Sequence, residues 1–325
     1  MNLKEIDYKL LSYLYHNYNE SFSKIAKATK LSRDQVEYRI NKYMKEGLII
    51  KFRPIFNYSK FGYNVIVVLL LKFEKPKMAG SFSKSLNKNK NCISYGKCYG
   101  KYDLYLNCVF KDDKELNGFI SKLFENETNF ISDYLLINPQ YTELFPIKFF
   151  NHSNKENSYI YNEDKTKTEL DEIDLKILKI LSNNGRERLI DIAIKTKISS
   201  ERAFYKLKRL KSEKIIFGNR IQFNMSLLGY FFTVIMVNFR NFSEKNKDKV
   251  KSFAKNSKNV NSISFNLQKP NCMIQLFHKE EGEIREAIAE IKKLFNEDSV
   301  EIDVLQIGED EWINTLPFIE EPSLK

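Results

Sequence analysis

The sequence has no long hydrophobic run. Its longest uninterrupted apolar stretch is Val65–Leu71, far shorter than the roughly 20 residues that a membrane-spanning helix needs. We interpret this stretch as a buried strand. The chain opens directly on a polar segment with helical periodicity, so we expect no signal peptide, no membrane segment and a cytoplasmic protein.

The chain is also poor in the residues that build metal sites. It has four cysteines and three histidines, without a C-x-x-C pair or a histidine cluster, so we expect no metal site and reduced, partly buried thiols. No Ser-His-Asp, Cys-His or phosphate-loop pattern is present either. We therefore predict no catalytic residue, no cofactor and a protein that is not an enzyme. The cysteines are Cys92, Cys98, Cys108 and Cys272, and the histidines are His16, His152 and His278.

What the chain does contain is a repeat. The segment Leu3–Tyr63 occurs again, without a gap, as Leu170–Tyr230, and 23 of these 61 aligned positions are identical. A period of 167 residues is too long for a solenoid. The pattern indicates one complete module copied once, so any function of the module is present in two copies.

The positive charge is concentrated in the repeated segments. Residues 1–58 carry 11 basic and 6 acidic side chains and residues 168–225 carry 13 and 8, so each is net +5 in a chain of net +11. The same basic excess on both copies favours a polyanionic partner.

Each copy begins with a pattern typical of three helices. Apolar residues recur at helical spacing over Leu3–Asn17, Ser32 is a good N-cap for a third helix over Arg33–Glu46, and Gly47 ends it. The following Leu48–Arg53 and Ile55–Phe56 predict a short two-stranded ribbon. Three helices and a ribbon make a winged helix-turn-helix. The second copy repeats the order over Leu170–Asn184, Leu189–Thr196, Ser200–Lys214 and Ile215–Phe223.

The second part of each copy predicts a βαββαβ sheet domain of the ferredoxin-like type. The overall class is α+β, with two copies of a winged helix-turn-helix followed by such a sheet. We expect winged helices at 1–58 and 169–225, sheet domains at 59–150 and 226–318, and a tail at 319–325. A polar linker should span 151–168, where Tyr159–Tyr161 could dock on a sheet.

In this order and spacing, each copy resembles the Lrp/AsnC family of transcription regulators. The resemblance rests on Leu170–Leu178 in the first helix, Ile192-Ala193 in the second, the Leu31-Ser32 and Ile198-Ser199 turns, Glu46–Ile49, and Phe-Asn-x-x-x-x-Gly-Tyr after each ribbon. It implies a sequence-specific, double-stranded-DNA-binding regulator. It also implies that paired sheet domains, here within one chain, form an internal pseudo-dimer, with a homodimer of such chains as the alternative.

The third helices are the predicted DNA readers, because such a helix presents base-reading side chains from its N-terminal half. An exposed charged face on a structural bundle would look the same. The second copy's reader is the more basic, net +4 over residues 199–214 against +1 over 32–47, so we expect it to bind more tightly. With the strand residues that follow, the predicted contacts are Arg33, Gln35, Tyr38, Arg39, Lys42, Arg53, Ser200, Arg202, Tyr205, Lys206, Arg209 and Arg220.

Gly100–Leu104 resembles the family's glycine-x-x-aspartate turn, which implies that Gly100, Tyr102 and Asp103 bind a small effector such as an amino acid. A hairpin turn capped by Asp103 explains the same residues equally well. In the second copy we align Leu267 and Pro270 with Gly100 and Asp103, so we expect no such site there.

Two other functions fit the same architecture. Sirohaem decarboxylases share the fold, but the stretches equivalent to their catalytic histidine region, Ile93–Lys97 and Ile263–Leu267, contain no histidine, and proton transfer needs a positioned acid. The other alternative is an interaction scaffold that does not bind DNA, against which the basic second reader argues.

Overall fold

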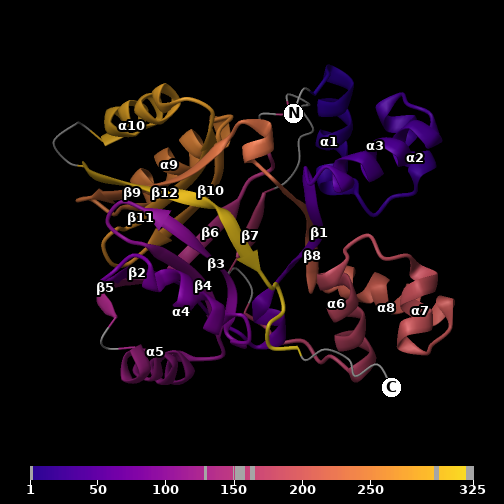
Figure 1. The fold of residues 1–325 in the computed structure, drawn as a ribbon, viewed down its shortest axis with the longest axis horizontal. Coiled ribbons are helices and arrows are strands. Elements are labelled where there is room, and N and C mark those ends of the chain that lie inside the picture. Colours follow the sequence, from indigo (N-terminus) through magenta and orange to yellow (C-terminus); the bar gives the residue numbers. More distant parts are fainter. Residues whose placement is uncertain are drawn as a thin grey trace.

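The computed structural model describes residues 3–127, 130–148, 150, 158–161, 165–295 and 300–319. It confirms the α+β class: two three-helix units lie on one side of the molecule and two sheet domains on the other, with a two-stranded ribbon in between (Figure 1). Among the described residues, no helix has both the length and the apolar character to span a membrane.

The three-helix units begin where the sequence predicts them. The first contains α1 (Glu5–Asn17), α2 (Phe22–Thr29) and α3 (Arg33–Lys45), and the second contains α6 (Glu172–Asn183), α7 (Leu189–Thr196) and α8 (Ser200–Ser212). Ser32 and Ser199 cap α3 and α8, because each hydroxyl oxygen accepts a hydrogen bond from the backbone N–H three residues on.

The ribbon differs from the prediction. Each copy contributes a single strand, β1 (Ile49–Phe56) and β8 (Ile216–Phe223), and these two strands pair antiparallel with each other. Arg53 lies opposite Arg220, its equivalent in the repeat, so the pseudo-twofold axis passes between them. The prediction of a two-stranded wing within each copy was wrong, because local alternation indicates a strand but not its partner.

Each ribbon strand packs against helices of both copies. Helix α1 packs on β8 and α6 packs on β1. Accordingly Ile221 and Phe223 belong to the core of the first three-helix unit, whereas Phe56 and Tyr58 belong to the core of the second. Each three-helix unit is therefore completed by the other copy, and the ribbon fixes their relative position.

Each sheet domain has the predicted βαββαβ order. The first contains β2 (Val65–Phe73), α4 (Met78–Leu86), β3 (Cys92–Tyr99), β4 (Leu104–Phe110), α5 (Asp113–Glu127) and β5 (Ile131–Ile137). The second contains β9 (Phe231–Phe239), α9 (Glu244–Asn256), β10 (Val260–Asn266), β11 (Cys272–His278), α10 (Glu281–Phe295) and β12 (Val300–Ile313). Short 3-10 turns, Tyr58–Phe61 and Ser226–Leu228, connect each ribbon strand to its sheet.

The sheets are joined by strands that pass from one copy to the other. Strand β12 pairs with β9 in its own copy and then, from Gln306 onward, also with β3 of the first copy. In the first copy β5 is followed by β6 (Pro139–Leu144), which pairs with β10. With β7 (Tyr159–Tyr161) at one edge, the strand order β5-β2-β4-β3-β12-β9-β11-β10-β6-β7 is therefore continuous across both copies.

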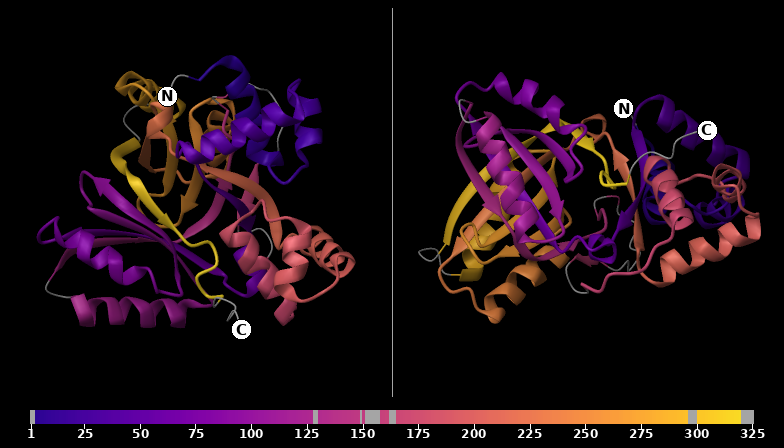
Figure 2. Two further views of the ribbon diagram at one scale, coloured as in Figure 1. Left: turned by 45° about the vertical axis from the view of Figure 1, so that its right-hand side comes forward. Right: turned by 90° about the horizontal axis from the view of Figure 1, so that it is seen from below.

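Helices cover the outer faces of the sheets, and the inner faces pack on each other. Helices α4 and α5 lie over the first sheet and α9 and α10 over the second (Figures 1 and 2). Between the sheets lies a core filled by side chains from both copies, among them Tyr102, Tyr105, Met236 and Met273. This packing makes the sheet pair a single body.

The linker contributes one further strand. Tyr159–Tyr161 forms β7, which pairs with β6, and both tyrosine rings contact Phe217 of the ribbon. The suggested docking of this segment is confirmed. Residues 151–157 and 162–164 of the linker, with His152, lie outside the described residues.

Candidate nucleic-acid interface

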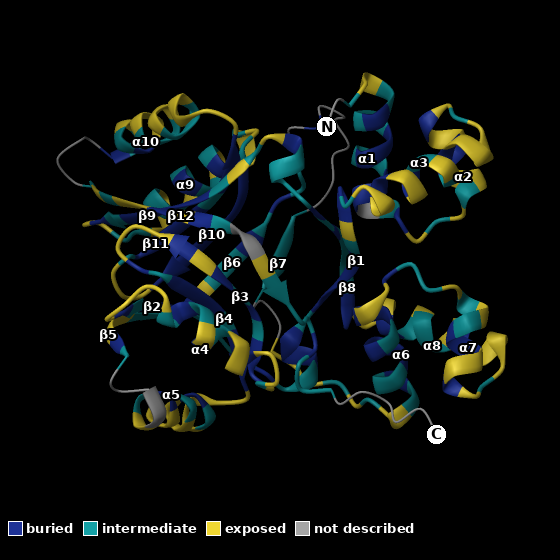
Figure 3. Cartoon of the chain, in the orientation of Figure 1, coloured by how far each residue is buried: buried dark blue, intermediate teal, exposed yellow. Residues whose placement is uncertain are grey.

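The candidate interface is the exposed surface of α3 and α8, which we call the reader helices. Their buried faces are formed by Val36, Ile40 and Tyr43 in one helix and by Ala203 and Leu210 in the other. The N-terminal half of each helix is exposed on the opposite side (Figure 3). Both helices thus have the accessible face that insertion into a major groove requires.

The centres of the two exposed faces carry the same chemistry. Tyr38 is 67% exposed and its equivalent Tyr205 is 60% exposed. An acidic residue precedes each tyrosine by one turn, Asp34 in α3 and Glu201 in α8, and Lys42 and Lys208 are exposed further along. These positions are therefore exposed on both readers, while their contact with DNA stays a prediction.

In the first copy, a buried carboxylate holds one of the predicted contact residues. Asp7 of α1 accepts hydrogen bonds from Arg39 and Tyr43 of α3 and from the backbone N–H of Lys4. Burial by itself would raise the pKa of Asp7, but the hydrogen bonds and the Arg39 charge outweigh it and lower the pKa. Arg39 thus anchors α3 to α1.

In the second copy, the equivalent carboxylate holds two cations. Asp174 is fully buried, and it receives Lys206 Nζ at 3.0 Å and Arg209 Nη2 at 2.5 Å. Lys206 also pairs with Asp171 at 2.5 Å. Although burial opposes it, this hydrogen bond contributes to lowering the pKa of Asp171 to about 2. Lys206 and Arg209 are therefore partly neutralised by acidic residues of the same unit.

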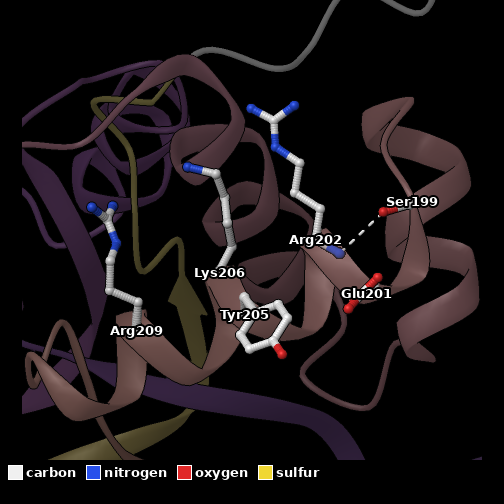
Figure 4. Close-up of a pocket in the computed structure, with 6 residues that line it drawn as sticks. All are labelled: Ser199, Glu201, Arg202, Tyr205, Lys206 and Arg209. Atoms are coloured by element: carbon white, nitrogen blue, oxygen red, sulfur yellow. Dashed lines mark hydrogen bonds between the residues drawn. The ribbon is translucent and has the colours of Figure 1, made fainter.

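The cations of α8 border a hollow of about 380 Å³, which is lined by Ser199, Glu201, Arg202, Tyr205, Lys206 and Arg209. Arg202, Lys206 and Arg209 extend from the helix toward the same side, whereas Glu201 and Tyr205 point elsewhere (Figure 4). A row of cations on one flank of a reader helix suits contact with a nucleic acid, through its phosphates or its base edges.

The charge difference between the readers is smaller than the sequence suggested. Net charges counted along each helix omit Asp171 and Asp174, which lie in α6 or just before it and pair with α8. On α3, Arg33 lies 3.7 Å from Glu37 and Lys42 lies 3.9 Å from Glu46. The second reader keeps its advantage mainly through Arg202 and Lys208, so the expected charge asymmetry no longer rests on Lys206 and Arg209.

The two ribbon arginines do not lie on the exposed surface that the sequence predicted. Arg53 is only 9% exposed, and its guanidinium donates to Gln222 and to the carbonyl of Ile313 in β12. Burial lowers the pKa of Arg53 to about 10. Arg220 is desolvated as well, which opposes its charge, but Tyr15 and Glu311 raise its pKa. Both arginines connect the ribbon to its surroundings, so we withdraw them from the candidate interface.

The aspartate of the glycine-x-x-aspartate turn makes contacts within its own sheet domain. One Asp103 carboxylate oxygen accepts from the backbone N–H of Phe73 at 2.9 Å, and the other lies 3.2 Å from Lys72 Nζ. Gly100 has φ +122° beside the backbone of Val304, and Tyr102 is buried between the sheets. These contacts favour the interpretation in which Asp103 caps the hairpin.

The second copy has an equivalent cap that the sequence alignment missed. Strands β4 and β11 have the same length and begin 168 residues apart, so Asn271, and not Pro270, corresponds to Asp103. Asn271 accepts from the backbone N–H of Phe239 at 3.1 Å and donates to its carbonyl at 2.8 Å. The assignment of Leu267 and Pro270 as equivalents was wrong, because the copies differ in length before β10.

Residues considered for other chemistry are engaged in packing. Tyr95 stacks on Trp312 at 5.1 Å between ring centroids and donates to Asn87. All the cysteines are buried and free. Burial raises the pKa of the Cys98 thiol to about 12, so it stays protonated. Within the described ranges no group of His, Cys, Asp and Glu has the proximity needed to hold a metal ion.

One exposed reader residue was missed from the sequence. Phe204 is 51% exposed and its ring contacts Tyr205 edge-on at 5.8 Å. An aromatic residue next to the buried Ala203 could equally belong to the core, so the residue type alone did not indicate that Phe204 is exposed. Its equivalent in the first copy is Glu37, and that contrast was the available hint.

Comparison with known proteins matches both helical units. A family model described as winged helix-turn-helix DNA-binding matches residues 3–50 and 170–216. The HTH-type transcriptional regulator FL11 of Pyrococcus abyssi is 28% identical over 120 residues, covering 37% of this chain and 79% of that protein. The FL11 of Pyrococcus furiosus is 29% identical over 118 residues, covering 36% and 78%.

Over its whole length the chain is similar to a solved enzyme structure. The siroheme decarboxylase NirDL matches with a TM-score of 0.66 and 16% identity, covering 97% of this chain and 96% of that one. At this identity the likeness concerns the fold. Together with the two helix-turn-helix matches, it agrees with a chain in which a unit of a winged helix-turn-helix and a sheet domain is duplicated.

Proposed function

We propose that this protein is a transcription regulator that binds double-stranded DNA with both reader helices of a single chain. The observation that carries the proposal is the pair of winged helix-turn-helix matches, each ending in a reader helix with an exposed N-terminal half. The relatives named HTH-type transcriptional regulators support it.

The ribbon gives this proposal its geometry. Because β1 pairs with β8 and each strand packs in the other copy's unit, the two readers are held as a pseudo-symmetric pair. Symmetric pairs of such helices bind half-sites about one helical turn apart. We propose that one chain supplies what two subunits supply in a symmetric dimer, with the exposed lysines contacting phosphates and the helix N-termini facing the bases.

A salt-controlled binding assay tests the proposal. Each lost phosphate contact lowers the dependence of affinity on salt by about one unit of slope. We expect Lys208→Ala and Lys42→Ala each to weaken binding to a selected duplex and to reduce that slope. Lys88→Ala, in the loop after α4 of the sheet domain, is the control and should change neither. Binding that does not respond to salt or to either reader variant contradicts the proposal.

A second candidate is an enzyme acting on a tetrapyrrole, favoured by the full-length likeness to the siroheme decarboxylase. It requires an acid near the substrate, and the stretch from Ile93 to Lys97 offers Tyr95, which is stacked on Trp312 and bonded to Asn87. Titration with an iron porphyrin, followed by its absorbance, tests this candidate. A saturable spectral shift with turnover supports it, and an unchanged spectrum removes it.

A further inference from the structure

The two reader helices differ at their third position, where α3 has Gln35 and α8 has Arg202. In α3 this side chain is committed to the helix start. Gln35 Oε1 accepts from the backbone N–H of Ser32 at 3.0 Å, and Ser32 Oγ accepts from the backbone N–H of Gln35 at 3.1 Å. This reciprocal capping box holds Gln35 against its own backbone, away from a DNA base.

In α8 the side chain at the same position makes no such hydrogen bond to the start of the helix. Ser199 Oγ accepts from the backbone N–H of Arg202 at 3.2 Å, but an arginine side chain has no acceptor with which to complete the box. The Arg202 side chain is exposed, and no ion pair of its guanidinium occurs within the described part of the chain. Its neighbours Lys206 and Arg209, by contrast, are tied to Asp174. In Figure 4 Arg202 points away from the helix on the same side as both.

The chemistry of a free guanidinium at this place is specific. Arginine in the major groove pairs bidentately with the O6 and N7 acceptors of guanine, a contact that discriminates against other bases by roughly 5- to 150-fold. The first turns of a reader helix are the part that approaches base edges. Lys206 and Arg209 sit one and two turns further along and are already paired, so they suit phosphates better than bases.

We propose that Arg202 reads a guanine in the half-site bound by the second copy, and that the half-site bound by the first copy lacks this requirement. The preferred DNA site is then not palindromic, although the protein is pseudo-symmetric. This inference rests on the proposed DNA binding and adds to it the identity of a base and the residue that recognises it.

Selection from a random duplex library tests the inference on the full chain. The wild-type protein should enrich a site with one fixed guanine in one half and no fixed base at the matching position of the other. Arg202→Gln should lose preference for that guanine and bind the selected site roughly 5- to 150-fold more weakly, while its affinity for random DNA changes little. Thermal unfolding of the variant should show no loss of stability, because Arg202 is exposed and a glutamine at this position can complete the capping box with Ser199.

A gain-of-function variant and a matched control separate the outcomes. Gln35→Arg should add a fixed guanine to the other half-site and make the selected sequence closer to a palindrome. Lys208→Ala, at another exposed position of α8, should weaken binding to all sequences alike. If the wild type selects a palindrome, or if Arg202→Gln keeps the same base preference, the inference is overturned while DNA binding stands. If the wild type binds no duplex at any salt concentration, the proposed function fails with it.

Discussion

At the scale of single residues, a few buried carboxylates determine how the readers are held. Asp7 and Asp174 each connect the first helix of a unit to its reader helix, but with different partners. In the first copy Tyr43 and Arg39 donate to Asp7. In the second, Leu210 replaces the tyrosine and Arg209 supplies the missing donor to Asp174. One aspartate position therefore fixes both readers while leaving different cations available on their surfaces.

These carboxylates predict a loss of stability in acid. The pKa of Asp7 is lowered below the usual range of an aspartate, and that of Asp171 is lowered to about 2. A carboxyl group whose folded-state pKa is depressed stabilises the fold above its unfolded pKa, and this contribution is lost as the pH falls through the folded value. We expect the urea midpoint to fall between about pH 4 and pH 2.

The variant Asp171→Asn provides the comparison for this acid transition. It removes one of the depressed carboxyl groups and should show a smaller loss of its urea midpoint over the same pH range, with Asp7 still contributing. Identical pH profiles for the variant and the wild type would mean that the pair of Asp171 and Lys206 contributes nothing in solution.

The hydrogen bond of Asp103 to the Phe73 backbone leads us to expect that two substitutions of Asp103 affect stability differently. Asp103→Ala leaves the Phe73 N–H without its acceptor and should destabilise the protein by about 1–3 kcal/mol. Asp103→Asn should cost less, because Asn271 makes the same backbone bond in the second copy. Chemical denaturation of both variants measures the difference. If the alanine variant is as stable as the wild type, the carboxylate is not a structural cap and its role in effector binding returns.

At the scale of elements, the helices could be predicted from the sequence and the pairing of strands could not. Apolar spacing and the serine caps are local signals, so α3 and α8 begin where Ser32 and Ser199 predict. Strand pairing is not local: nothing in Ile49–Phe56 itself indicates that its partner lies in the other copy. For the same reason Arg53 looked like an exposed strand charge, and β6 and the end of β12, which join the sheets, were missed.

The contact between the copies near the ribbon predicts the effect of one added methyl group. Gly185 donates its N–H to the Phe52 carbonyl at 3.0 Å, and a Cβ at this glycine would lie 2.9 Å from the same oxygen and against the Tyr18 hydroxyl. Gly185→Ala should therefore destabilise the chain by about 1–3 kcal/mol through overpacking. Thermal or urea unfolding measures this effect.

Gly118→Ala is the matched control for that substitution. It lies on the exposed side of α5, where nothing approaches within 4 Å of an added Cβ, and it should stabilise the helix by about 0.5–1 kcal/mol. Equal effects of the two substitutions would show that the copies are not packed together at Gly185 as described.

At the scale of the whole molecule, the duplication produces one body. The repeat predicted one module copied once, whereas the ribbon strands pair with each other across the copies, β12 passes onto the first sheet and β6 onto the second. A protease site inserted between residues 153 and 154 tests this. After cleavage the two fragments should elute together at the mass of the intact chain and separate only in denaturant. Separation in native buffer would mean that the linker alone holds the copies together.

Because the two copies are joined into one body, a single chain should be sufficient to bind one DNA site. Both readers and the ribbon that positions them belong to a single polypeptide, and their differences at Gln35 and Arg202 mark two distinct half-sites. The most direct test is native mass spectrometry of the protein with its selected duplex, combined with a footprint of that duplex. We expect one chain per duplex and two protected half-sites with centres about one helical turn apart. Two chains per duplex, or protection of a single half-site, would contradict the account.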